Sequence, residues 1–294
     1  MKILSLFDGI SCARVALERA GIPVEVYFAS EIDKYAIQIS KKNYPDIWQL
    51  GSVVGLDYDL GQFCRRNDIG ESNTLGINYM EDIDLLIGGS PCQDLSIAKR
   101  DRKGLDGERS GLFWEYVRIL NEVKPKYFIL ENVASMPKEA KDIITKTLGV
   151  EPVLFNANLV SGQMRKRLFW TNIPFTLPED KNIKLKDILI DGIAEKEKSL
   201  VITATYSRAC PQDYFGKSNR QLIKVGEFNS GGQGDRVYSI DGKSVTLSAL
   251  GGGRGAKTGL YETTKGIYRK LHPIECERLQ GLPDNYTEGV YSKI

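Results

Sequence analysis

Short apolar runs alternate with helix-spaced segments through the first 171 residues of the chain, and this alternation most constrains the fold. A chain that repeats strand and helix in this way builds a mostly parallel, twisted sheet with helices on both faces. We therefore predict an α/β fold. The expected strands are Lys2–Phe7, Val24–Ser30, Ile83–Ile87, Tyr127–Leu130, Val153–Ala157 and Leu168–Thr171. The expected helices are Ala13–Ala20, Lys34–Asn43, Leu112–Val123, Lys138–Leu148 and, after a proline at the first helical position, Pro273–Gln280.

The composition changes after Pro174. Residues 175–265 are richer in polar, charged and glycine positions, with glycine runs at 231–234 and 251–253. We interpret this stretch as a smaller, loop-rich second domain. The expected division is a catalytic and cofactor-binding domain over 1–174, a second domain over 175–267, and a return to the first domain over 268–294.

The cysteine and histidine content excludes several classes of protein. Five cysteines are scattered without a CxxC pair, which suits a reducing cytosol better than a disulfide framework or a zinc site. His272 is the single histidine, so no histidine-rich metal site is expected. We expect no signal peptide and no membrane span, because no apolar run is long enough for either. The net charge of +2 neither demands nor excludes a polyanionic partner.

Unusual residues follow the first two predicted strands, where ligands bind in open α/β sheets. Phe7-Asp8-Gly9-Ile10-Ser11 follows the first strand, and its glycine permits a sharp turn before the next helix. Glu31-Ile32-Asp33 follows the second strand, where an acidic residue commonly binds ribose hydroxyls. The alternative is a plain strand–helix turn with a capping carboxylate. No GxGxxG is present, which disfavours a dinucleotide and leaves a single-nucleoside cofactor such as S-adenosylmethionine open.

A cysteine in a glycine-proline loop follows the strand Ile83–Ile87. In Gly88-Gly89-Ser90-Pro91-Cys92-Gln93, Cys92 is expected to be exposed and rigidly held, as a reactive thiolate requires. A cysteine without such a loop is more often buried and inert. Glu131 ends the next strand and would point into the same cleft; the alternative is a helix cap. Gln163, Arg165 and Arg167 alternate along an extended segment. The two arginines could bind a base carbonyl or a phosphate, although exposed arginines are usually only solvated.

Taken in order, these motifs resemble the DNA cytosine-C5 methyltransferases. The series continues in Arg269-x-Leu271-His272-Pro273-x-Glu275-Cys276-x-Arg278-x-x-Gly281-x-Pro283, and it extends from Lys2 to about Tyr286. The resemblance implies a Rossmann-like, S-adenosylmethionine-dependent methyltransferase fold with a target-recognition domain. It also implies double-stranded DNA as the partner and a target cytosine that is flipped out of the duplex.

The resemblance implies roles for individual residues. Cys92 would be the thiolate that adds to C6 of cytosine, and Glu131 would supply a proton at N3. Arg165 would bind the O2 carbonyl, and Arg167 would orient neighbouring groups. The cofactor would be held by residues at the ends of the strands and in the loops that follow them, with no metal: Phe7, Asp8, Gly9, Ile10, Ser11, Glu31, Ile32, Ser52, Pro91 and Leu112.

The resemblance also implies DNA contacts. The basic segment 96–110 resembles the family's mobile loop, and Ser96 and Arg109 are its candidates for phosphate contacts. Segments around residues 231–261 resemble the recognition domain of the HhaI-type bacterial members. By that resemblance Gln233 would fill the space left by the flipped base, Arg236 would read a guanine, and Thr246 would contact the backbone. We expect a short site with guanine beside the target cytosine.

The sequence departs from the family pattern at three places. Ser11 replaces a common glycine, Ser52 stands where an aspartate is usual, and Ile294 precedes any final Gly-Asn-Ser-Val-like motif. The last departure leaves open a truncated chain, an inactive DNA-binding fragment, or a second polypeptide that supplies the motif. An RNA cytosine-C5 methyltransferase is the other alternative. We otherwise expect a monomeric, cytoplasmic protein of bacterial or phage origin, from a restriction system or an orphan gene.

Overall fold

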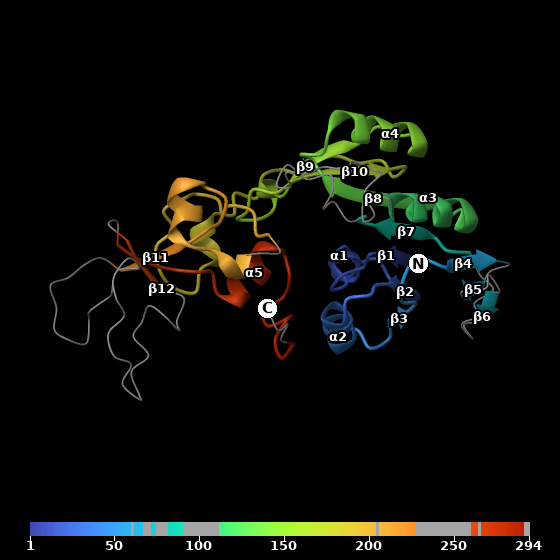
Figure 1. Ribbon diagram of the computed structural model, residues 1–294, viewed down its shortest axis with the longest axis horizontal. Helices are drawn as coiled ribbons and strands as arrows, with labels where there is room; N and C mark the ends of the chain where they lie inside the picture. The colour runs from blue at the N-terminus through green and yellow to red at the C-terminus, as the bar shows by residue number, and fades with distance from the viewer. Residues whose placement is uncertain are drawn as a thin grey trace. The chain divides into compact units, whose positions relative to one another are not determined.

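The structure, a computed structural model, describes residues 1–59, 62–66, 72–74, 82–90, 112–203, 206–226, 260–263 and 266–290. The chain divides into two compact units. Unit 1 consists of Met1–Phe155, Lys166–Leu177 and Glu288–Ile294, and unit 2 consists of Asn156–Arg165 and Pro178–Thr287. Figure 1 labels their helices and strands.

A mostly parallel sheet forms the centre of unit 1. Its seven described strands have the order β3-β2-β1-β7-β8-β10-β9. β1 pairs in parallel with β2 and β7, β2 with β3, and β7 with β8, whereas β10 runs antiparallel to β8. The predicted α/β fold is therefore confirmed. The strands are β1 (Lys2–Leu6), β2 (Val26–Ser30), β3 (Trp48–Gln49), β7 (Leu85–Gly88), β8 (Tyr127–Val133), β9 (Val153–Asn156) and β10 (Lys166–Thr171).

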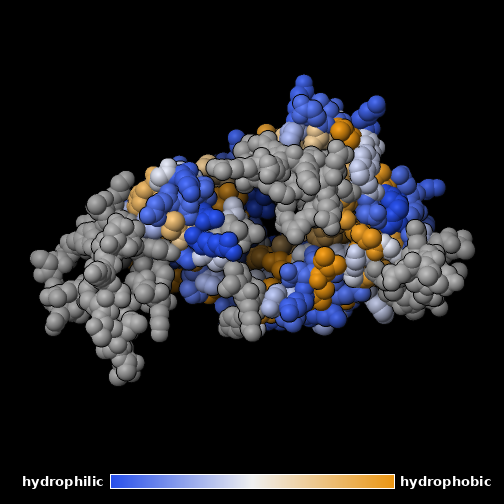
Figure 2. All heavy atoms as spheres, in the orientation of Figure 1, coloured by the Kyte–Doolittle hydropathy of each residue, from blue (hydrophilic) through white to orange (hydrophobic). Residues whose placement is uncertain are grey.

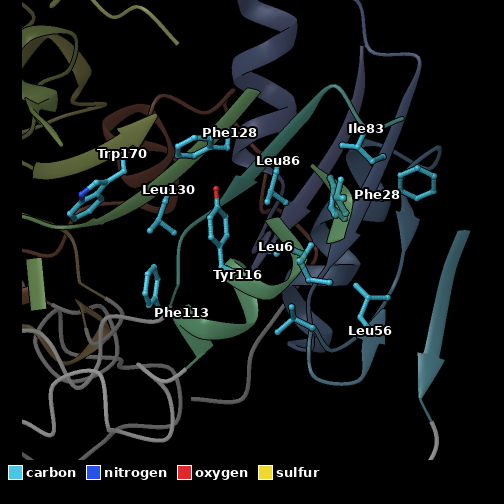
Figure 3. Close-up of a cluster of buried hydrophobic side chains, with 14 of the residues drawn as sticks. Leu6, Phe28, Leu56, Ile83, Leu86, Phe113, Tyr116, Phe128, Leu130 and Trp170 are labelled. Carbon is cyan, nitrogen blue, oxygen red and sulfur yellow. The ribbon is translucent and has the colours of Figure 1, made fainter. Parts of the chain in front are cut away.

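Helices cover both faces of this sheet, as the pattern predicted. They are α1 (Cys12–Arg19), α2 (Lys34–Asn43), α3 (Leu112–Val123) and α4 (Lys138–Leu148). Alternating side chains of β1 divide between two cores: Ile3 packs with Leu17 of α1 on one face, and Leu4 packs with residues of α3 and α4 on the other. Figure 3 shows this second core, in which Tyr116 of α3 lies among Leu86, Leu130 and other buried side chains. The solvent-facing surface of α4 is largely hydrophilic (Figure 2).

A small antiparallel sheet, which the sequence did not predict, adds to the same core. It has the order β4-β5-β6, with β4 (Leu56–Asp59), β5 (Gln62–Arg66) and β6 (Ser72–Thr74). Leu56 and Phe63 are buried with the α3 side of the main sheet. This sheet therefore extends the hydrophobic core beyond the strands that periodicity identifies.

Unit 2 has its own core and little regular structure. Its sheet has the order β11-β13-β12, all antiparallel, with β11 (Ile223–Gly226), β12 (Leu260–Thr263) and β13 (Gly266–Arg269). Helix α5 (Pro273–Leu279) contributes Leu279 to a core with Tyr206, Tyr214 and Tyr268. Short turns complete it: η2 (Ala157–Leu159), η3 (Leu185–Ile188), η4 (Tyr206–Arg208) and the π-helical η5 (Gln212–Gly216).

The division into units differs in detail from the expected domains. Residues 268–287 belong to unit 2, because α5 packs on the core of that unit, and only the residues from Glu288 onwards group with unit 1. The short stretch Asn156–Arg165 also belongs to unit 2. No helix in the described ranges is both long enough and apolar enough to cross a membrane.

Candidate active site

The register of the main sheet brings four predicted site segments to one edge. Leu6 pairs with Ser30 and with Gly88, and Gly88 pairs with Leu130. The next residue of each chain segment therefore lies at the carboxyl edge of the parallel strands, where α/β folds bind their ligands. Those residues are Phe7, Glu31, Gly89 and Glu131.

Glu31 fixes the backbone at the end of β2 and in the Phe7–Ser11 loop. Its Oε2 accepts a hydrogen bond from the Gly9 amide at 2.8 Å, and its Oε1 accepts from the amides of Ile32 at 2.7 Å and Asp33 at 2.8 Å. A carboxylate has about four acceptor positions, so the bonds from described residues leave one for a ribose hydroxyl. Beside it the Ile32 side chain is 75% exposed, which offers an apolar face to a planar base.

The Phe7–Ser11 loop is strained and rests on a buried polar cluster. Phe7, Gly9 and Ser11 all have positive φ, at 57°, 61° and 60°, and only glycine adopts this conformation without cost. An added Cβ at Gly9 would meet nothing within 4 Å, so the space beside this backbone is open. Asp8 is the centre of the cluster: its carboxylate accepts from the Ser11 hydroxyl at 2.5 Å and from the Tyr27 hydroxyl at 2.7 Å.

Burial raises the pKa of the Asp8 carboxyl above its ordinary value, and hydrogen bonds from neighbouring hydroxyl groups counteract part of this effect. Burial likewise raises the pKa of Tyr27, and the adjacent Asp8 carboxylate adds to that rise. Tyr27 is therefore a hydrogen-bond donor to Asp8 throughout the neutral range.

Glu131 forms an ion pair with Arg167 at the same edge of the sheet. Arg167 Nε lies 2.6 Å from Glu131 Oε1, and the two side chains are 18% and 33% exposed. They are diagonal neighbours on one face of the β8–β10 pair, because Glu131 is opposite Phe169 and Arg167 is opposite Val133. A Cβ at Gly89 would lie 3.2 Å from Glu131 Oε2, so glycine leaves room for this carboxylate.

Asn132 anchors the start of the loop that carries Cys92. The Asn132 side chain is 1% exposed, and its Nδ2 donates to Ser90 Oγ at 3.2 Å and to the Ser90 carbonyl at 3.4 Å. Its Oδ1 accepts from the Val133 amide at 2.8 Å. β8 therefore fixes the backbone two residues before Cys92, on the strand next to the one that Cys92 follows.

The Gln163-x-Arg165-x-Arg167 segment spans the two units. Gln163 is fully buried in unit 2, and its Oε1 accepts a hydrogen bond from Gln280 at 3.3 Å. The backbone amide of Arg165, also in unit 2, donates to Asn156 Oδ1 at 2.9 Å. Arg167 belongs to β10 of unit 1. Gln163 thus has a packing role in unit 2.

Two other predicted cofactor residues are placed in unit 1. Ser52 accepts a hydrogen bond from the Val54 amide at 3.1 Å, and Leu112 begins α3 and packs against the core. The remaining predicted residues lie outside the described ranges: Pro91, Cys92, Ser96, Arg109, Gln233, Arg236 and Thr246.

Several residues that support the site were not predicted. Ser11 Oγ lies 2.6 Å from Ser40 Oγ in α2, and Gln49 Nε2 donates to Ser40 Oγ at 3.2 Å. The signal available in the sequence was a serine next to Ile39 on the buried side of an amphipathic helix. Tyr27 carried a similar signal, as a hydroxyl-bearing residue within an otherwise apolar strand.

Comparison with known proteins agrees with the resemblance predicted from the motifs. The family described as "C-5 cytosine-specific DNA methylase" matches residues 1–293. The chain is 29% identical to the type II methyltransferase M.HhaI of Haemophilus parahaemolyticus, over 97% of this chain and 85% of that protein. It is also 29% identical to the type II methyltransferase M.NgoPII of Neisseria gonorrhoeae, over 97% of this chain and 86% of that protein.

Among solved structures, a putative DNA modification methyltransferase encoded within an Escherichia coli prophage aligns with a TM-score of 0.47 and 19% identity, covering 79% of this chain and 62% of that chain. The family assignment rests on the match over nearly the whole sequence. With this match, the chain belongs to the C-5 cytosine-specific DNA methylases: it is a DNA cytosine-C5 methyltransferase, and its methyl donor is S-adenosylmethionine.

Proposed function

We propose that Cys92 is the nucleophile of methyl transfer, assisted by Glu131, Arg165 and Arg167. One observation carries the proposal: the carboxyl edge of the sheet holds Glu131 beside Gly89, and Asn132 bonds to Ser90 two residues before Cys92. The nucleophile and the proton donor thus come from adjacent strand ends, which supports their acting on one ring.

The cofactor would be held at the other end of the same edge. Glu31 would accept a ribose hydroxyl, the exposed Ile32 side chain would lie against the adenine, and the open backbone at Gly9 would line the remainder. Phe7, Asp8, Ile10, Ser11, Ser52, Pro91 and Leu112 complete the proposed set.

The proposed chemistry follows from the poor nucleophilicity of C5 in cytosine. The Cys92 thiolate adds to C6, and Glu131 gives a proton to N3, so that the ring becomes an enamine with a nucleophilic C5. Arg165 would stabilise the charge on O2. S-adenosylmethionine, when bound, would supply the methyl group for C5 and would leave as S-adenosylhomocysteine. A base then removes the proton from C5, the bond between C6 and Cys92 breaks, and N3 returns its proton to Glu131.

The target atom is inaccessible in a stacked duplex, so the cytosine must leave the helix. We propose that Ser96 and Arg109 contact phosphates, that Gln233 fills the vacated space, that Arg236 reads guanine, and that Thr246 contacts the backbone. A monomeric state and a cytoplasmic location stay predictions; mass photometry of the purified, active protein tests the first.

Substitution of the nucleophile tests the mechanism. We expect Cys92→Ser to lower methyl transfer to duplex DNA below about one-thousandth of wild type, because a hydroxyl is a far weaker nucleophile than a thiolate. The readouts are bisulfite sequencing of plasmid DNA and covalent trapping on duplexes that contain 5-fluorocytosine.

The matched control is Cys276→Ala. Burial raises the pKa of the Cys276 thiol to about 12, so this cysteine stays protonated and inert. The control should retain turnover and trapping. Normal turnover by Cys92→Ser, or transfer to RNA but not to duplex DNA by the wild type, would contradict the proposal.

A further inference from the structure

The polar cluster beneath the Phe7–Ser11 loop forms one continuous hydrogen-bond chain. From α2 and β3 it runs from Gln49 Nε2 to Ser40 Oγ at 3.2 Å and from Ser40 to Ser11 Oγ at 2.6 Å. It ends on Asp8 Oδ2, 2.5 Å from Ser11 Oγ. Tyr27 donates to the other oxygen of Asp8 at 2.7 Å.

The ionised Asp8 carboxylate determines the direction of every bond in the chain. A carboxylate only accepts, so the single proton of Ser11 must point to Asp8. Ser11 can then only accept from Ser40, and Ser40 can only accept from the amide nitrogen of Gln49. Each hydroxyl uses its one proton, so removing any member takes one hydrogen bond away from a buried neighbour, which is costly.

The hydrogen-bond chain is buried, and the loop that it supports has a strained backbone. Ser11, Ser40 and Tyr27 are 0% exposed. Ser11 nevertheless has a φ of 60°, and Phe7 has a φ of 57°, conformations that cost a non-glycine residue free energy and persist where the surroundings hold them. Glu31 also holds the loop, because its Oε2 accepts from the Gly9 amide at 2.8 Å.

We infer that Ser11, Ser40 and Tyr27 are positioning residues that act through Asp8 to hold the Phe7–Ser11 loop in its cofactor-binding conformation. Asp8 is the centre of this hydrogen-bond chain: Ser11 and Tyr27 donate to its two oxygens, and Ser5 also hydrogen-bonds to it. The inference rests on the proposed role of the loop in binding S-adenosylmethionine. The inference also explains why residue 11 is a serine although its φ is left-handed: the Ser11 hydroxyl links the loop to Ser40 of α2.

Removal of single hydroxyl groups tests the inference. We expect Ser40→Ala and Tyr27→Phe to raise the Kd for S-adenosylmethionine about fivefold to tenfold, the effect of one lost hydrogen bond. The kcat at saturating cofactor should stay within about twofold of wild type.

Ser11→Ala should weaken binding of S-adenosylmethionine more than Ser11→Gly, because glycine relieves the strain at φ 60°. Calorimetric titration gives the Kd, and hydrogen exchange of residues 7–11 without cofactor should be faster in each variant.

The matched control is Thr145→Ala, which removes the hydroxyl that accepts from Trp170 Nε1 at 3.0 Å in α4 of the same unit. It should lower the melting temperature and leave the Kd and the loop exchange unchanged. Tyr27→Phe preserves the packing of its ring, so it stays informative where a serine variant fails to fold.

The variant Glu31→Ala distinguishes the proposed cofactor role of the loop from the inferred positioning role of Ser11, Ser40 and Tyr27. Wild-type affinity in Glu31→Ala would overturn the cofactor role of the loop, and with it the inference. Lost binding in Glu31→Ala, together with wild-type affinity and exchange in folded Ser40→Ala and Tyr27→Phe, would overturn the positioning role alone.

Discussion

Arg167 Nε lies 2.6 Å from the Glu131 carboxylate, and we propose that this contact sets the orientation of that carboxylate. We expect Arg167→Ala to lower the rate of methyl transfer about tenfold to a hundredfold, because a proton donor displaced by about 1 Å loses that much catalysis. Arg167→Lys should recover only part of the rate, since an ammonium lacks the planar geometry of Nε. Single-turnover transfer of labelled methyl groups gives the rate, and the Kd for S-adenosylmethionine should not change.

Arg118 of α3 provides the comparison for that prediction. It is 28% exposed, bonds to Glu115 and Glu122, and serves the packing of β4 rather than the sheet edge. Arg118→Ala should therefore lower stability without slowing transfer at a temperature where it is folded. Equal rates in Arg167→Ala and wild type would rule out the orienting role.

The same site shows what residue patterns can predict. The motifs predicted the position of Glu31 and Glu131 at the sheet edge, because an acidic residue directly after an apolar strand lies there. They did not identify Ser40 or Gln49, whose importance depends on contacts between α2, β3 and the loop. The left-handed φ at Ser11 could not be predicted from the sequence either, because a glycine often indicates that conformation and a serine does not.

At the scale of elements, helices with clear end signals were predicted to the residue. Asp33 caps α2 by accepting from the Tyr35 and Ala36 amides, and Gly149 ends α4 with a φ of 69°. The strands β4, β5 and β6 were missed because they are short, because β4 and β5 mix charged with apolar residues, and because β6 has only polar residues. Their pairing with one another and the packing of Leu56 and Phe63 stabilise them, and local sequence does not contain that information.

The buried start of α5 depends on one carboxylate. Glu275 is fully buried and accepts from Arg269 at 2.7 Å, from the Ile190 amide at 2.9 Å and from the His272 amide at 2.8 Å. Burial alone would raise the pKa of Glu275, but these hydrogen bonds outweigh burial and lower the pKa below its ordinary value of 4.5.

A lowered carboxyl pKa stabilises the folded state above the unfolded pKa, and this stabilisation is lost as the pH falls through the folded value. We expect Glu275→Gln to cost about 3 kcal/mol at pH 7, because it leaves Arg269 partly unpaired in a buried site. The difference from wild type should shrink below pH 4.5. Urea unfolding at a series of pH values measures it.

The exposed pair at the end of the same helix is the control. Arg278 and Asp284 lie 2.6 Å apart with side chains 35% and 43% exposed, so Asp284→Asn should change stability little. An equally large effect of both substitutions, or a Glu275→Gln difference that does not depend on pH, would contradict the assignment to the buried carboxylate.

For the whole molecule, composition predicted two parts but not their boundaries. The change after Pro174 lies close to Pro178, where the long second segment of unit 2 begins. The sequence did not reveal that Asn156–Arg165 leaves unit 1, nor that α5 packs with unit 2. Both assignments depend on which hydrophobic core each segment packs against. Apolar periodicity predicts that a face is buried, but it does not predict which residues bury it.

The two units can be followed separately in one experiment, because Trp48, Trp114 and Trp170, the three tryptophans of the chain, all belong to unit 1. The units have separate hydrophobic cores, so we expect a ligand of unit 1 to stabilise that unit first. At about 100 times its Kd, S-adenosylmethionine should raise the free energy of unfolding detected by tryptophan fluorescence by about 2.7 kcal/mol. Hydrogen exchange of peptides around Tyr206 and Tyr268 should respond less. Glu31→Ala should abolish the fluorescence shift, whereas equal protection of both units would show that they unfold as one.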